Sequence, residues 1–197
     1  MDNLTKKPTI EISFIFDAES GVNSPESWYL SACELIYVQK QLEKNIFQIL
    51  NEPKIEPINL KEEYVEIALR PLDVLGGFSR IYMYLSGIIF ENLTKAIIIQ
   101  KSPEKLNEIT SPRKGHDLSY LIGLCGFELS IEENEIFERI SVYIVWAGRY
   151  SHPKRKNFDD KKYGEIKFKT EDIDFVKEWI SKLNDLANYS VYLEKNR

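Results

Sequence analysis

FSRIYMYLSGIIFENLTKAIIIQ, residues 78–100, is the stretch of sequence that decides the fold. Apolar residues recur in it at steps of three and four, the spacing that places side chains on one face of an α-helix. Further apolar residues fall on its other sides, so other elements must surround this helix. Glu91 and Lys95 interrupt the stretch, whereas a membrane-spanning helix needs about 20 continuous apolar residues. The pattern therefore predicts the central helix of a helical bundle with no membrane contact.

The composition limits the classes of function. The chain has 197 residues, a formal net charge of −5 and a pI near 5.3, so contact with a nucleic acid would require a local basic patch. Its two cysteines, Cys33 and Cys125, lie far apart and form no metal-binding or disulfide pattern. Two histidines leave few places for a metal site, and we expect neither a metal nor another cofactor. The N-terminus shows no secretory signal pattern, so we expect a cytoplasmic protein.

Start signals and apolar periodicity predict the remaining elements. Ser24-Pro25 and the capping box from Ser130 to Glu133 open two helices, and Thr170 with the acids that follow opens a last one. The predicted helices cover residues 25–50, 130–147 and 170–187, with shorter ones at 61–69 and 113–126. Gly76-Gly77 is expected to turn the chain into the central helix, and residues 149–169 to form a surface loop.

The predicted fold is all-α, a bundle of roughly five up-and-down helices. Residues 24–197 form its single domain. Residues 1–23 are expected to form an extended N-terminal arm, because apolar residues alternate there with the period of a strand at Ile10, Ile12, Phe14 and Phe16.

The sequence contains two candidate phosphate sites, each centred on a histidine. His116 follows the basic pair Arg113-Lys114 and precedes Asp117 at the start of a helix, where free N–H groups favour an anion. In the alternative interpretation Asp117 caps the helix and His116 is a structural hydrogen-bond donor.

Arg149, Tyr150 and His152 follow the helix predicted at 130–147 and form the second candidate. There an arginine would bind a phosphate and a histidine would transfer a proton. The alternative is a cation at a helix end with packed aromatic neighbours.

Two further groups of charges have a functional and a structural interpretation. Lys154, Arg155 and Lys156 form the most basic stretch and would follow a phosphate backbone, unless they are only a solvated loop face. Glu91 and Lys95, four residues apart, are interpreted as a structural ion pair inside the bundle rather than as a catalytic pair.

Three of these motifs occur in the order seen in a known superfamily. Glu91-x-x-x-Lys95-Ala96 on the central helix, His116-Asp117-Leu118-x-x-Leu121 and then Arg149-Tyr150 resemble the HEPN superfamily of prokaryotic helical-bundle proteins. The resemblance spans about residues 25–150. It implies a four- or five-helix bundle, homodimerisation, and work in antiphage defence, toxin–antitoxin or RNA-processing systems.

The resemblance also implies a site. Many HEPN proteins are metal-independent ribonucleases that use an arginine and a histidine, which points to Arg149 with His152 or His116 as catalytic residues. The two histidines here follow Arg113 and Arg149 by three positions, a shorter spacing than the family pattern. Two alternatives remain open: a non-catalytic domain that binds RNA, a nucleotide or a protein, and a structural subunit of a larger assembly.

Overall fold

The computed structural model describes residues 24–51, 71–147 and 168–187. Within these ranges every regular element is a helix, which confirms the all-α class. The elements are α2 (Pro25–Asn51), α3 (Pro71–Lys101), the 3₁₀ turn η1 (Pro103–Lys105), α4 (Leu106–Ile109), α5 (Leu118–Leu124), α6 (Ile131–Val142), the π-helical segment η2 (Tyr143–Ala147) and α7 (Glu171–Ala187). The predicted arm at 1–23, the helix at 61–69 and the loop up to residue 167 lie outside the described residues.

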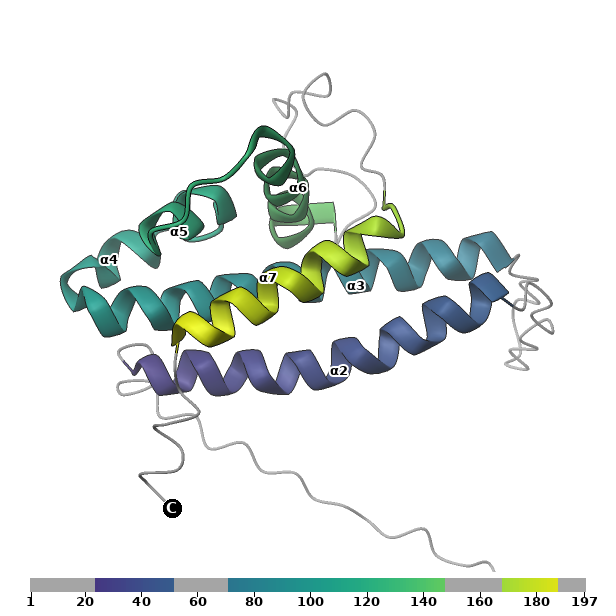
Figure 1. Ribbon diagram of the computed structural model, residues 1–197, viewed down its shortest axis with the longest axis horizontal. Coiled ribbons are helices and arrows are strands. Elements are labelled where there is room, and N and C mark those ends of the chain that lie inside the picture. Colours follow the sequence, from purple (N-terminus) through teal and green to yellow (C-terminus); the bar gives the residue numbers. More distant parts are fainter. Residues whose placement is uncertain (1–23, 52–70, 148–167, 188–197) are drawn as a thin grey trace, which may run out of the picture.

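The helices α2 and α3 form a long antiparallel hairpin (Figure 1). Trp28, near the start of α2, contacts Lys95 near the end of α3, and a buried bond from Gln39 Nε2 to Ser86 Oγ, 2.5 Å long, joins the middles of the two helices. The predicted start of α2 is confirmed, because the Ser24 hydroxyl accepts a hydrogen bond from the Ser27 amide and Pro25 is the first helical residue.

The central helix α3 is longer than the sequence predicted. It begins at Pro71, so Gly76 and Gly77 lie inside the helix and the turn expected there is wrong. Proline is common in the first turn of a helix. The backbone N–H groups of that turn have no partner within the helix, so the absence of an N–H in proline loses no hydrogen bond. Glycine costs about 1 kcal/mol in a helix, and Leu75 and Phe78 pack against the core on either side of the pair. Packing of this kind offsets the weak propensity.

The third long helix, α7, lies along the hairpin and runs in the direction of α3 (Figure 1). The Tyr29 hydroxyl donates to Asn184 Oδ1 at 2.7 Å, and Lys177 forms an ion pair with Glu43, so α7 also contacts α2. The short helices α5 and α6 pack on α3 and on each other. The described residues thus form three long helices, α2, α3 and α7, with the shorter helices α5 and α6 packed on α3.

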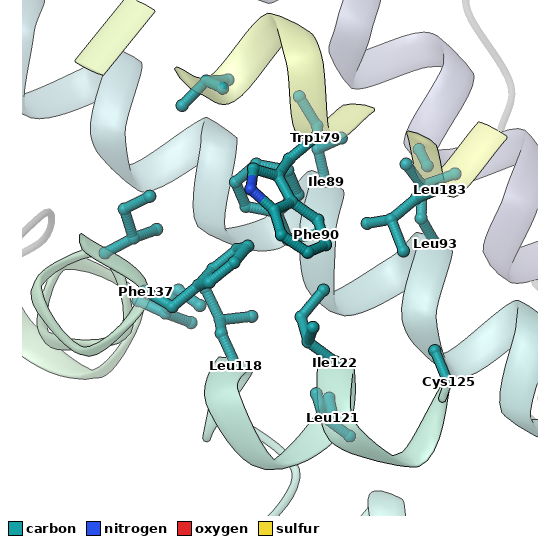
Figure 2. Close-up of a cluster of buried hydrophobic side chains, with 14 of the residues drawn as sticks. Ile89, Phe90, Leu93, Leu118, Leu121, Ile122, Cys125, Phe137, Trp179 and Leu183 are labelled. Carbon is teal, nitrogen blue, oxygen red and sulfur yellow. The ribbon is translucent and has the colours of Figure 1, made fainter. Parts of the chain in front are cut away.

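Aromatic side chains join α3, α6 and α7 in the core. The Phe137 ring contacts those of Phe90, Phe175 and Trp179 edge to face, with centroids 5.3, 5.2 and 5.0 Å away. Figure 2 shows Leu118, Leu121 and Ile122 of α5 among the buried side chains of this cluster. Such rings bury large apolar areas and fix the relative positions of the helices.

None of the helices in the described residues combines the length and the apolar character that a membrane crossing requires.

Candidate functional site

The central helix carries a buried ion pair close to its C-terminal end. Lys95 Nζ lies 2.5 Å from Glu91 Oε1, and the two residues are only 3% and 8% exposed. Their spacing of four residues places both side chains on one face of α3, as expected from the sequence. The Lys95 ammonium also lies over the Trp28 ring of α2, 4.9 Å from its centroid, which is a cation–π distance.

The second oxygen of the Glu91 carboxylate contacts a histidine from a distant part of the chain. His116 Nδ1 lies 2.8 Å from Glu91 Oε2, and 43% of the His116 side chain is exposed. The contact with Glu91 is made by Nδ1, and the second ring nitrogen, Nε2, takes no part in it. One carboxylate therefore bridges a buried cation and a half-exposed imidazole.

The turn before α5 sets the position of His116. The Gly115 amide donates to the Ser111 carbonyl at 2.9 Å, and a Cβ on Gly115 would lie 2.6 Å from the Ile109 carbonyl oxygen, so only glycine fits there. On the other side, Asp117 caps α5 by accepting the Tyr120 amide at 3.0 Å. The predicted cap is confirmed, and His116 is held between a tight turn and a helix start.

The contacts of Glu91 determine its charge. Burial raises the pKa of the Glu91 carboxyl, but the hydrogen bond from His116 and the charge and hydrogen bond of Lys95 together outweigh that effect and hold its pKa below the ordinary value of 4.5. Glu91 is therefore ionised at neutral pH. An imidazole whose Nδ1 contacts an ionised carboxylate is the arrangement that proteins use for general acid–base chemistry.

The two basic residues before His116 do not contact Glu91. Arg113 is exposed, and Lys114 Nζ lies 2.5 Å from Glu108 Oε1. The Tyr120 hydroxyl also donates to Glu108, and Lys114 lies over the Tyr120 ring. An acidic partner therefore balances the charge of Lys114, one of the lysines predicted to bind phosphate.

The structure brings together the Glu91–Lys95 pair and His116, which were two separate candidates in the sequence. Arg149, Tyr150, His152, Lys154, Arg155 and Lys156 lie outside the described residues. The contacts of Trp28 with Lys95 and of Glu108 with Lys114 were not predicted from the sequence. The signal for Trp28 was its position in the first turn of a helix antiparallel to α3, whereas nothing local marks Glu108 as the partner of Lys114.

A second buried ion pair links α6 to the start of α7. Arg139 Nη2 donates to Asp172 Oδ1, and Asp172 Oδ2 accepts the Lys169 amide at 2.8 Å. Asp172 is 2% exposed, and the Arg139 Nε atom is buried without a hydrogen-bond partner. Across the described ranges, no three histidine, cysteine or acidic side chains gather in a way that could hold a metal ion.

Comparison of the chain with family models, with curated proteins and with solved structures gave no match.

Proposed function

We propose that this chain is a HEPN-like cytoplasmic protein that associates with RNA and cleaves it without a metal, in a prokaryotic defence or toxin–antitoxin system. The observation that supports the proposal is the half-exposed His116 imidazole, whose Nδ1 contacts the buried, ionised Glu91. A histidine so held can accept a proton from a substrate hydroxyl.

The proposed reaction is transesterification by the ribose. The 2′-oxygen attacks the adjacent phosphorus while His116 takes the 2′-hydroxyl proton, and the bond from phosphorus to the 5′-oxygen breaks. The products are a 2′,3′-cyclic phosphate and a 5′-hydroxyl, after a proton reaches the leaving oxygen. The sequence motifs assign the stabilisation of the phosphate charge to Arg149 and make His152 the candidate for the second proton transfer.

The test is cleavage of end-labelled RNA by the purified protein in EDTA. We expect the native chain to cut, and the variants His116→Ala and Arg149→Ala each to lose at least about a hundredfold in rate, as is typical when an acid–base group is removed. His152→Ala shows whether the second histidine participates. Lys182→Ala, which removes a half-exposed lysine of α7 that is paired with Glu178, is the control and should cut like the native protein. Absence of cleavage by the native chain would contradict the proposal.

Exposed apolar side chains favour a second candidate function, that of a non-catalytic protein-interaction or structural subunit. Tyr37 and Val38 of α2 are 70% and 48% exposed, and Ile81 of the paired helix α3 is 46% exposed. Apolar groups of this size on adjacent helices are common at protein interfaces. A homodimer or a complex with another protein would cover them.

Sedimentation equilibrium tests this second function. We expect a dimer of the native chain and a monomer after Val38→Glu with Ile81→Glu, since a buried unpaired carboxylate opposes association. Glu34→Gln, at an exposed polar position of α2, is the control and should stay dimeric. A native chain that is monomeric and retains no partner would count against an interaction role.

A further inference from the structure

The Glu91 carboxylate uses its two oxygens for two different side chains. Oε1 lies 2.5 Å from Lys95 Nζ and Oε2 lies 2.8 Å from His116 Nδ1. Within the described residues, these are the side chains that hydrogen-bond the Glu91 carboxylate. Lys95 and His116 therefore share one carboxylate, and Lys95, which is 3% exposed, lies over the Trp28 ring of α2 on its other side.

The charge of Glu91 decides which imidazole nitrogen carries the proton. An ionised carboxylate only accepts hydrogen bonds, so Nδ1 must donate. In the neutral imidazole the lone pair then lies on Nε2. If Glu91 were protonated, it could donate to Nδ1 instead, and the proton of the ring would move to Nε2.

We infer that Lys95 is a positioning residue for His116: by keeping Glu91 ionised, it fixes the Nδ1–H tautomer and leaves the Nε2 lone pair as the base of the site. The catalytic meaning of this inference rests on the proposed function. Its structural content concerns only three side chains, so it can be tested without RNA.

Other charged groups surround His116 but do not share its contact with Glu91. Asp117, the next residue, accepts the Tyr120 amide, and Lys114 is paired with Glu108 of α4. Arg113 is exposed. The side chain that α6 brings to this turn is Ser141, which is uncharged and accepts the Leu118 amide. Lys114 is thus the matched control for Lys95: a lysine two residues from His116 that has a different carboxylate partner.

The test is a two-bond ¹H–¹⁵N correlation spectrum of the histidine rings near pH 7.5, in which the two neutral tautomers give different patterns. We expect the Nδ1–H pattern for His116 in the native chain and in Lys114→Met. In Lys95→Met the buried carboxylate loses its cation, takes up a proton and shifts His116 towards the Nε2–H tautomer. A folded Lys95→Met variant that keeps the native pattern would overturn the inference.

Two further variants keep the test decisive if Lys95→Met does not fold. Lys95→Arg retains the cation and should retain the Nδ1–H pattern. The double variant Glu91→Gln/Lys95→Met removes the obligatory acceptor, because a Gln amide can accept from Nδ1 through Oε1 or donate to it through Nε2, and the spectrum should show both tautomers. Loss of the Nδ1–H pattern in Lys95→Arg contradicts the role given to Lys95, and an unmixed Nδ1–H pattern in the double variant contradicts the role given to the Glu91 charge.

Kinetics separate this inference from the proposed function. If the native chain cleaves RNA, Lys95→Met should lower kcat at least about tenfold with little change in KM, as expected for a group that acts through another, and Lys95→Arg should restore most of the rate. If the native chain cleaves nothing, the proposed function fails while the ring spectra still decide whether Lys95 sets the tautomer. If the native chain cleaves RNA but His116 keeps the Nδ1–H tautomer in folded Lys95→Met, the inference about Lys95 is overturned and the proposed function is not.

Discussion

Gly87 of α3 lies against Ile144 of the π-helical segment η2 so closely that a Cβ at position 87 would stand 2.4 Å from Ile144 Cγ1 and 2.8 Å from its Cδ1. The helix α3 and η2 therefore meet through a residue without a side chain. A glycine in the middle of a long helix has here a packing reason that outweighs its low helix propensity.

Gly87→Ala should destabilise the protein. The new methyl group overlaps the Ile144 side chain, and overpacking of this kind costs about 1–3 kcal/mol, more than the gain of about 1 kcal/mol in helix propensity. The free energy of unfolding in urea measures the effect. Gly76→Ala is the matched control, because Gly76 is exposed in the same helix with nothing within 4 Å of its Cβ position, and it should stabilise. Equal effects at both positions would show that the close approach is not the cause.

Gly115→Ala should displace His116. Its Cβ would lie 2.6 Å and 2.7 Å from the carbonyl oxygens of Ile109 and Ser111, and backbone atoms in a tight turn have little freedom to move. We expect a loss of stability of about 1–3 kcal/mol and a changed ring spectrum of His116. Gly123→Ala, which has open space around its Cβ, is the control and should leave that spectrum as it is.

Acid should weaken the fold partly through Glu91. The folded-state pKa of Glu91 lies below its ordinary value of 4.5, so protons bind the unfolded chain more readily at this group. Its stabilisation is therefore complete above about pH 4.5 and is lost as the pH falls through the folded-state pKa. Urea unfolding between pH 7 and pH 3 measures this loss. The free energy of unfolding should fall less between pH 7 and pH 3 in Glu91→Gln than in the native chain. An identical pH dependence in that variant would contradict the part given to Glu91.

Arg139→Met should lower the free energy of unfolding at neutral pH, and should lower it less in acid. The change leaves Asp172, which is 2% exposed, without its cation, and breaking a buried pair typically costs about 3–5 kcal/mol. Burial raises the pKa of Asp172 above its ordinary value of 3.8, while the Lys169 amide and Arg139 oppose that rise. Without Arg139 the pKa should rise further, so the folded variant binds a proton more readily than the unfolded chain and regains stability as the pH falls from 7 to 5.

The control for this prediction is Arg113→Met, at an exposed position, which should change the free energy of unfolding by less than about 0.5 kcal/mol. A deficit of Arg139→Met that is the same at pH 7 and pH 5 would show that Asp172 does not take up the proton.

Local patterns in the sequence predicted much of the fold. Apolar periodicity and start signals located α2, α6 and α7, and both the Ser130–Glu133 capping box and the Asp117 cap are present. These predictions succeed because a cap or an amphipathic face depends on residues within a few turns. The start of α3 was missed, because two adjacent glycines are a local signal for a turn and the packing that overrides it involves other helices.

The site was predicted only in parts for the same reason. Glu91 and Lys95 are four residues apart, so their pairing follows from helical geometry. The contact of Glu91 with His116 spans 25 positions and depends on how the turn at Gly115 folds back onto α3. The π-helical segment η2 was not predicted either, and it contacts α3 where Ile144 lies against Gly87.

The hydroxyl of Ser141 connects the start of α5 to α6 by hydrogen bonds. Ser141 Oγ accepts the Leu118 amide at 3.1 Å and donates to the Phe137 carbonyl at 2.9 Å. Leu118 follows His116 by two residues. The hydrogen-exchange rate of the Leu118 amide therefore reports whether the turn that carries His116 opens away from α6 while the rest of the fold stays intact. An amide that exchanges only with global unfolding would make His116, α5 and α6 one cooperative unit, and a ligand held by His116 would then protect α6 as well.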